Sequence, residues 1–230
     1  MIINAEIQIN GALSGVQADD TLVFSKDIKS YDNILAELDD ARVSPFSSLF
    51  MLSFPNEEKY LFAHWQPGYE RFEQNGRYYC TRCLYEISAS DMQKCGYDYS
   101  AVVASLPPIE HIKEHRYNID PLVLDVVPKS IENDRAASSM VRYMLSALLN
   151  RKRILIRLGQ SDRLKNDEML KSSKLHSMLS AINAFHPAFR RYVSFAFSVK
   201  SDFLNDYSEP SFSKFWVLAF QDDDFMTSEA

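Results

Sequence analysis

The segment SSMVRYMLSALLNRKRILIRL, residues 138–158, predicts an amphipathic helix that leads into a buried strand. In its first part, apolar residues recur at i, i+1, i+4, i+5 and i+8, which places them on one side of a helix that faces a core. Arg151-Lys152-Arg153 closes the helix with cations near the negative end of its dipole. The run Ile154-Leu155-Ile156 then precedes Gly159, a pattern typical of a strand buried on both faces.

The residues that follow predict a second helix and two further strands. Apolar residues between positions 169 and 182 recur at helical spacing, and Pro187 ends this helix or begins the next turn. Residues 192–199 and 215–220 are rich in aromatic and β-branched side chains, which favours strands. Residues 136–197 therefore predict the order helix, strand, helix, strand.

The first half of the chain predicts mainly strands. Residues 2–9 alternate between apolar and polar side chains, as expected for a half-buried strand. Further strands are predicted at 21–25, 48–54, 60–65 and 77–87, with a hairpin joining the second and third of these. Short helices are predicted over 34–38 and 88–95. The polar and aromatic residues 66–76 predict a loop.

The expected fold class is α+β. A strand-rich N-terminal half with an antiparallel or mixed sheet precedes an α/β half with two long amphipathic helices. We divide the chain into a strand-rich part (residues 1–104), a connector punctuated by prolines (105–132), a helix–strand–helix–strand part (133–220) and an acidic tail (221–230). The sequence leaves open whether the two halves form one compact domain.

The composition excludes several classes of function. Of the 230 residues, 46% are hydrophobic and 24% charged, which is enough to bury a core without cross-links. The chain has only six glycines and neither GxGxxG nor GxxxxGK[ST], so no phosphate-binding loop is expected. A net charge of −6 argues against a nucleic-acid partner.

Cysteine usage and the absence of long apolar runs suggest a cytoplasmic protein. Three cysteines do not make a disulfide framework, and free thiols suit a reducing compartment. The first residues lack the basic and apolar regions of a signal peptide. No apolar run reaches the roughly 18 residues that cross a bilayer, so no membrane partner is expected.

Three cysteines form a candidate metal site. Cys80 and Cys83 are spaced as C-x-x-C and Cys95 follows, so a zinc site with one histidine is chemically allowed. However, a continuous strand over 77–87 would point Cys80 and Cys83 to opposite faces. The alternative is that the three are small, semi-buried thiols without a cofactor.

The best candidates for partner binding lie around the predicted loop at 66–76. They are His64, Trp65, Tyr69, Arg71 and Phe72, because long loops rich in aromatic residues often recognise other proteins. None of the histidines has a serine, cysteine or acid at a recognisable motif spacing. We therefore assign no catalytic residue.

Two pairs of basic positions form a candidate anion-binding site. Arg151 and Arg153 precede one predicted strand, and Arg190 and Arg191 precede another. Both pairs can simply complement helix dipoles and solvate strand ends. A shared site for a small anion requires that the pairs lie within about one Debye length, roughly 8–10 Å, of each other.

Residues 184–195, AFHPAFRRYVSF, resemble a pattern in the N-terminal domains of bacterial GTPase-associated proteins. There, a helix ends in a turn containing proline, followed by arginine and a Ser-Phe strand, and the layout of residues 138–158 and of 13–25 is similar. The helix–strand–helix–strand run also loosely resembles part of the DENN exchange-factor module. The resemblance implies a GTPase partner and a role as an accessory component of a bacterial conflict or antiphage defence system.

The sequence favours a non-catalytic adaptor or regulatory subunit that acts through a protein surface. The aromatic residues near 66–76 and the basic residues beside strands support this hypothesis. The alternative is a zinc- or thiol-dependent module that uses Cys80, Cys83 and Cys95.

Overall fold

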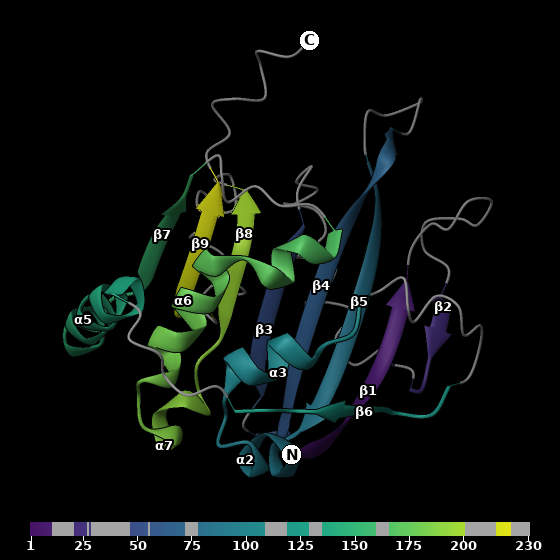
Figure 1. Cartoon of the computed structure of the whole chain (residues 1–230), viewed down its shortest axis with the longest axis horizontal. Coiled ribbons are helices and arrows are strands. Elements are labelled where there is room, and N and C mark those ends of the chain that lie inside the picture. Colours follow the sequence, from purple (N-terminus) through teal and green to yellow (C-terminus); the bar gives the residue numbers. More distant parts are fainter. Residues whose placement is uncertain are drawn as a thin grey trace.

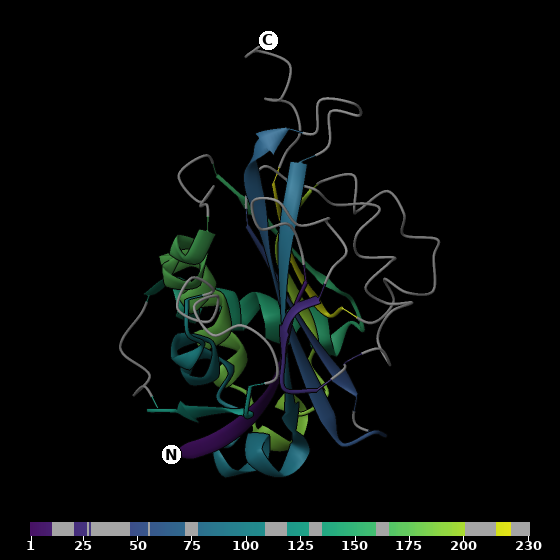
Figure 2. The same cartoon turned by 90° about the vertical axis from the view of Figure 1, so that its right-hand side faces the viewer.

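A computed structural model describes residues 1–10, 21–26, 28, 47–54, 56–71, 78–108, 119–128, 135–159, 166–200 and 215–221. These residues form a mixed nine-stranded sheet with helices packed on one of its faces (Figures 1 and 2). The fold class is therefore α+β with a strand-rich N-terminal half, as the sequence predicts. The predicted helix over 34–38 lies outside the described residues.

The strands are β1 (Ile2–Asn10), β2 (Thr21–Phe24), β3 (Ser48–Phe54), β4 (Lys59–Arg71), β5 (Tyr78–Ser88), β6 (Leu122–Asp125), β7 (Ile154–Leu158), β8 (Phe195–Lys200) and β9 (Val217–Gln221). The helices are α2 (Ala89–Lys94), α3 (Tyr99–Ser105), α5 (Arg135–Leu149), α6 (Ser173–Asn183) and α7 (Pro187–Arg190), with the 3-10 helix η3 (Asn166–Lys171) before α6. The strand order is β2-β1-β5-β4-β3-β8-β9-β7, and β6 also pairs with β1.

The two halves of the chain meet in this one sheet. Strands β1 to β5 pair antiparallel, whereas β8, β9 and β7 run parallel to one another. The two groups join through antiparallel pairing of β3 with β8, in which Leu49 lies opposite Phe197 and Met51 opposite Phe195. All four side chains are fully buried, so residues from both halves build the same core.

Alternation along the strands gives the sheet two apolar faces. The face beneath the helices includes the buried positions of β1, which confirms the predicted alternation of Ile3, Ala5, Ile7 and Ile9. On the opposite face a smaller cluster surrounds Phe50, whose ring centroid lies 5.0 Å from that of Trp65 and 6.1 Å from that of Phe215.

Helix α3, which the sequence pattern did not predict, links α6 to the junction between β3 and β8. Asp98 is its N-cap, and the Asp98 Oδ1 atom also accepts a hydrogen bond from Nδ2 of Asn183 in α6 at 2.6 Å. The Tyr99 ring lies between Phe62 of β4 and Phe195 of β8, at centroid distances of 6.4 and 6.1 Å. Helix α3 has only seven residues, and tertiary contacts rather than a repeating apolar pattern stabilise it. The sequence pattern therefore gives no signal for this helix.

Strand β8 contains a bulge at Ser198, where the backbone adopts a positive φ of 63°. The Ser48 hydroxyl of β3 donates to the Ser198 carbonyl oxygen, and Gln221 Nε2 of β9 donates to the Ser198 hydroxyl, both at 2.7 Å. An L-residue rarely adopts this conformation, and bulges of this kind re-aim a side chain. Here the bulge lets one serine bond to both strands that flank β8.

Strand β7 differs from the prediction of a strand buried on both faces. It is the last strand in the sheet order, and its burial alternates so that Ile154 and Leu158 are buried while Leu155 and Arg157 are exposed. A terminal strand has a neighbouring strand on one side only, which reduces the area that its apolar side chains can bury. The apolar run Ile154-Leu155-Ile156 therefore belongs to an edge strand.

We predict that the two halves unfold together, because they share the core at the β3–β8 junction. The chain has two tryptophans, Trp65 in β4 and Trp216 beside β9, so single-tryptophan variants report on each half separately. In urea titrations followed by fluorescence, the Trp65→Phe and Trp216→Phe variants should each give one transition, and each midpoint should match that of the same variant followed by far-UV circular dichroism. A tryptophan signal that changes at a different urea concentration from the secondary structure would contradict a shared core.

We also predict that Arg151→Gly stabilises the protein. Arg151 follows α5 with a positive φ of 54°, and the amide N–H of Lys152 donates to the Ala147 carbonyl oxygen at 2.8 Å. Glycine is the residue that this helix-ending conformation favours, so the substitution should raise the free energy of unfolding by about 1 kcal/mol. Urea unfolding of Arg151→Gly and of the neighbouring control Lys152→Gly tests this, and an equal effect of both would refute it.

Candidate interaction surface

The structure places the predicted binding-loop residues in and after β4. His64 is fully buried and Trp65 is 5% exposed, on opposite faces of the sheet, so neither presents a surface to a partner. Tyr69 and Arg71 also belong to β4, because pairing with β5 continues across a register shift to Arg71 opposite Tyr78. The predicted loop at 66–76 is therefore wrong for its first six positions. Phe72 lies outside the described residues.

The two candidate metal ligands whose side chains the structure describes, Cys83 and Cys95, lie in β5 and at the end of α2. Cys80 and Cys83 both belong to β5, which is continuous from Tyr78 to Ser88. Cys83 is buried in mid-strand opposite His64, whereas Cys95 is buried at the end of α2 with its thiol donating to the Met92 carbonyl oxygen. Among the described residues, no group of three or more His, Cys, Asp or Glu could hold a metal ion. Zinc binding by these cysteines stays a prediction.

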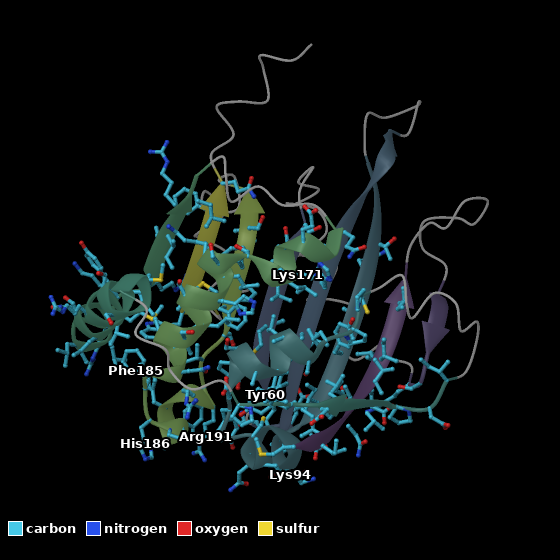
Figure 3. All side chains as sticks on the ribbon, in the orientation of Figure 1. Tyr60, Lys94, Lys171, Phe185, His186 and Arg191 are labelled. Carbon is cyan, nitrogen blue, oxygen red and sulfur yellow. The ribbon has the colours of Figure 1, made fainter. Side chains whose placement is uncertain are left out.

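Tyrosine and arginine residues cluster where α7 meets the sheet, and Figure 3 shows two of them, Tyr60 and Arg191. The Tyr60 and Ser53 hydroxyls both donate to the Arg191 carbonyl oxygen, at 3.0 and 2.5 Å. The Tyr99 hydroxyl donates to the Arg190 carbonyl oxygen at 2.6 Å. These bonds hold the turn after α7 against β3, β4 and α3.

Burial shifts the pKa of several groups in this cluster. Desolvation raises the pKa of Tyr60 to about 12, and burial likewise raises the pKa of Tyr99 well above its ordinary value. Burial also raises the pKa of the Cys95 thiol and lowers the pKa of the Arg190 guanidinium. Shifted pKa values often mark functional sites. Here both tyrosine hydroxyls bond to backbone carbonyls, which indicates a structural role.

The four arginines of the candidate anion site lie in different environments. Arg151 ends α5, and Arg153 lies beside the groove described below. The Arg190 guanidinium turns inward to donate to the Tyr97 carbonyl oxygen at 3.4 Å, whereas Arg191 lies over the Tyr192 ring.

Strand pairing does bring the starts of β7 and β8 to one end of the sheet. Ile154 and Phe195 both pair with Val217 of the strand between them, which separates their backbones by about 10 Å. This separation is close to one Debye length. A shared anion site at this end of the sheet stays a prediction.

Helix α5 exposes apolar side chains that its sequence pattern assigns to a core. Met144 is fully buried, but Leu145 is 47% and Leu149 is 75% exposed. On the other flank of the helix Tyr143 is 76% exposed, and Leu155 of β7 is 50% exposed. The helix lies beside β7 at the end of the sheet (Figure 1), where it packs against α6. We call Tyr143, Leu145, Leu149 and Leu155 the α5–β7 surface.

A groove of about 360 Å³ lies between α5 and β7. Its walls are apolar, and two basic side chains contribute to its lining: Met140, Tyr143, Met144, Ala147, Arg153, Ile154, Leu155, Ile156 and Lys174. No described strand pairs with the outer edge of β7, which borders this groove. The groove therefore combines apolar walls, positive charge and the edge of a sheet.

The sequence around this groove is strongly basic. Residues 135–159 contain no aspartate or glutamate, although the whole chain carries a net charge of −6. The same segment contains six basic residues: Arg135, Arg142, Arg151, Lys152, Arg153 and Arg157. Such a local excess of one charge attracts groups of the opposite charge. Two features of the sequence indicate this surface. One is the excess of basic residues, and the other is an apolar arc on α5 that is too wide to be buried by a single neighbouring element.

Comparison of the chain with known protein families, curated proteins and solved structures finds no match. Among the described residues, no helix is long and apolar enough to cross a membrane.

We predict that ionisation of the buried tyrosines destabilises the protein at alkaline pH. Below about pH 9 the phenols are neutral in both folded and unfolded chains. Above pH 10 the unfolded chain loses these protons first, because the pKa of Tyr60 is about 12 in the folded protein. The free energy of unfolding should then fall by up to about 1 kcal/mol per pH unit for such a tyrosine.

Urea unfolding at pH 8, 10 and 11 measures this effect. Tyr60→Phe should lower stability at pH 8 by about 1 kcal/mol through loss of its hydrogen bond, and should also flatten the decline above pH 10. Tyr143→Phe is the matched control, because Tyr143 is exposed and should leave the pH dependence unchanged. Equal alkaline slopes for wild type and Tyr60→Phe would refute the assignment.

Proposed function

We propose that this protein is a non-catalytic adaptor or regulatory subunit that binds another protein through the α5–β7 surface. The observation that supports this most is an apolar groove at the end of the sheet that is lined by the exposed Tyr143 and Leu155, with the exposed Leu145 and Leu149 on the other flank of α5. Contiguous exposed apolar surface with a polar rim is characteristic of protein interaction sites. The exposed residues of α5 gain a buried environment only when a partner covers them.

The tyrosine–arginine cluster supports the same proposal, because its polar groups serve the packing of the fold. The Tyr60 and Tyr99 hydroxyls donate hydrogen bonds to the carbonyl oxygens of Arg191 and Arg190, and the Asn183 side-chain amide donates to Asp98. Buried polar groups of this kind are satisfied in folded proteins for stability. The cluster therefore serves to fix the helices on the sheet.

The proposed partner class and compartment rest on the sequence. The resemblance of residues 184–195 to GTPase-associated proteins supports a GTPase, or another component of an antiphage defence system, as the first partner to test. The free thiols of Cys83 and Cys95 support a cytoplasmic, reducing location.

The test is an affinity pull-down of the tagged full chain from its native cell, with metal analysis of the same eluate. Wild type should retain a protein partner in stoichiometric amount. The double variant Tyr143→Glu/Leu149→Glu should reduce capture by at least about tenfold, because each carboxylate would be desolvated at the interface. Circular dichroism should show the same fold for both proteins, since both side chains are exposed.

Val127→Glu is the matched control for added negative charge. Val127 is 65% exposed and lies after β6, which pairs with β1, far from β7 in the sheet order. Capture by Val127→Glu should equal that of wild type. A partner that the α5 double variant retains, or stoichiometric metal without any protein partner, would overturn the proposal.

A further inference from the structure

The outer edge of β7 has backbone groups positioned to accept another strand. The Ile154 amide N–H donates to the Trp216 carbonyl oxygen at 2.9 Å, toward β9. In a parallel pair, alternate residues direct both backbone groups to opposite sides, so Leu155 directs its N–H and C=O away from β9. Proteins usually cover such an edge or protect it with charge and bulges. Here the positions that face away from β9 are the half-exposed Leu155 and the exposed Arg157.

The groove lies where side chains of an added strand would point. Ile154 and Ile156 face the side of the sheet that carries the helices, and both line the groove with Met140 and Ala147 of α5. In a strand added beside β7, every second side chain would point to this same side. Strand addition of this kind takes its affinity from backbone hydrogen bonds and its specificity from such pockets.

The charge at this edge distinguishes between possible occupants. Arg153 and Lys174 line the groove, and Arg157 is exposed on β7 itself. A second copy of the chain would bring its own basic β7 against this one, and like charges across paired strands are destabilising. A segment with aspartate or glutamate beside its apolar residues would instead be attracted.

We propose that the partner contributes an extended segment of alternating apolar and acidic residues that adds a strand to the outer edge of β7. One apolar side chain of this segment enters the groove between α5 and β7, and its carboxylates face Arg153 and Lys174. This inference rests on the proposed adaptor function and names the chemistry of the partner segment.

To test this, a displayed library of random twelve-residue peptides is selected for binding to the full-length protein. Enriched peptides should alternate apolar and acidic residues, and their affinity should fall with added salt. The variant Leu155→Pro removes the N–H that faces away from β9 and keeps the N–H groups that bond to β9, at an edge position where strands tolerate proline. It should bind the selected peptides about tenfold more weakly, whereas the matched control Leu155→Ala, which keeps the N–H, should lose less than about threefold.

A second measurement keeps the test decisive if Leu155→Pro fails to fold. Selected peptides are synthesised with backbone N-methyl groups at successive positions, and binding to wild type should be lost at every second position only. Failure to enrich any peptide, insensitivity to N-methylation, or enrichment of basic peptides or of peptides with helical apolar spacing would overturn the inference.

Other occupants give distinct results. Binding of wild type to vesicles containing phosphatidylserine in place of peptides would overturn the inference in favour of a lipid surface. Self-association that Leu155→Pro abolishes would assign the edge to a second copy. A captured partner that Tyr143→Glu/Leu149→Glu loses but Leu155→Pro retains would overturn strand addition while leaving the adaptor function intact.

Discussion

The rest of the structure depends on the antiparallel pairing of β3 with β8. Without it, the antiparallel strands and the three parallel strands would each expose an unpaired edge, and each would be a small sheet with little core. The pairing buries Leu49 and Met51 against Phe197 and Phe195 on the side that carries the helices. It ends at the Ser198 bulge, whose hydrogen bonds to β3 and β9 join the same strands again. The junction thus converts two marginal units into one sheet.

The helices are held on this sheet by aromatic packing and by buried hydrogen bonds. α3 and α7 are short, so intrinsic helix stability contributes little to them. Instead, the Tyr99 ring packs against Phe62 of β4 and Phe195 of β8, and its hydroxyl donates to the carbonyl oxygen of Arg190. A buried carbonyl without a donor would be costly, so these phenols are needed in their neutral form. Desolvation by burial raises the pKa values of Tyr60 and Tyr99, which favours this neutral form.

The two ends of the sheet differ. Among the described strands, the sheet order ends with β2, which pairs with β1, at one end and with β7, which pairs with β9, at the other. Helix α5 lies at this second end and buries Met144, but its apolar arc is wider than one contact can cover. Apolar area, positive charge and a strand edge therefore coincide at one place. Each of these features alone is common on protein surfaces. Their combination at one place favours binding of a protein partner there.

The sequence by itself determined the type of most elements, because those signals are local. The alternation of β1 and the helical spacing of α5 can be recognised within about ten residues, and both are present in the structure. The tertiary structure alone decided that β3 lies beside β8, that β7 is an edge and that His64 is buried within β4. These outcomes depend on contacts between residues as far apart as Ser48 and Ser198, separated by 150 positions. A period in the sequence shows which side of an element is apolar, but only the packing of distant elements decides which apolar side chains stay exposed for a partner.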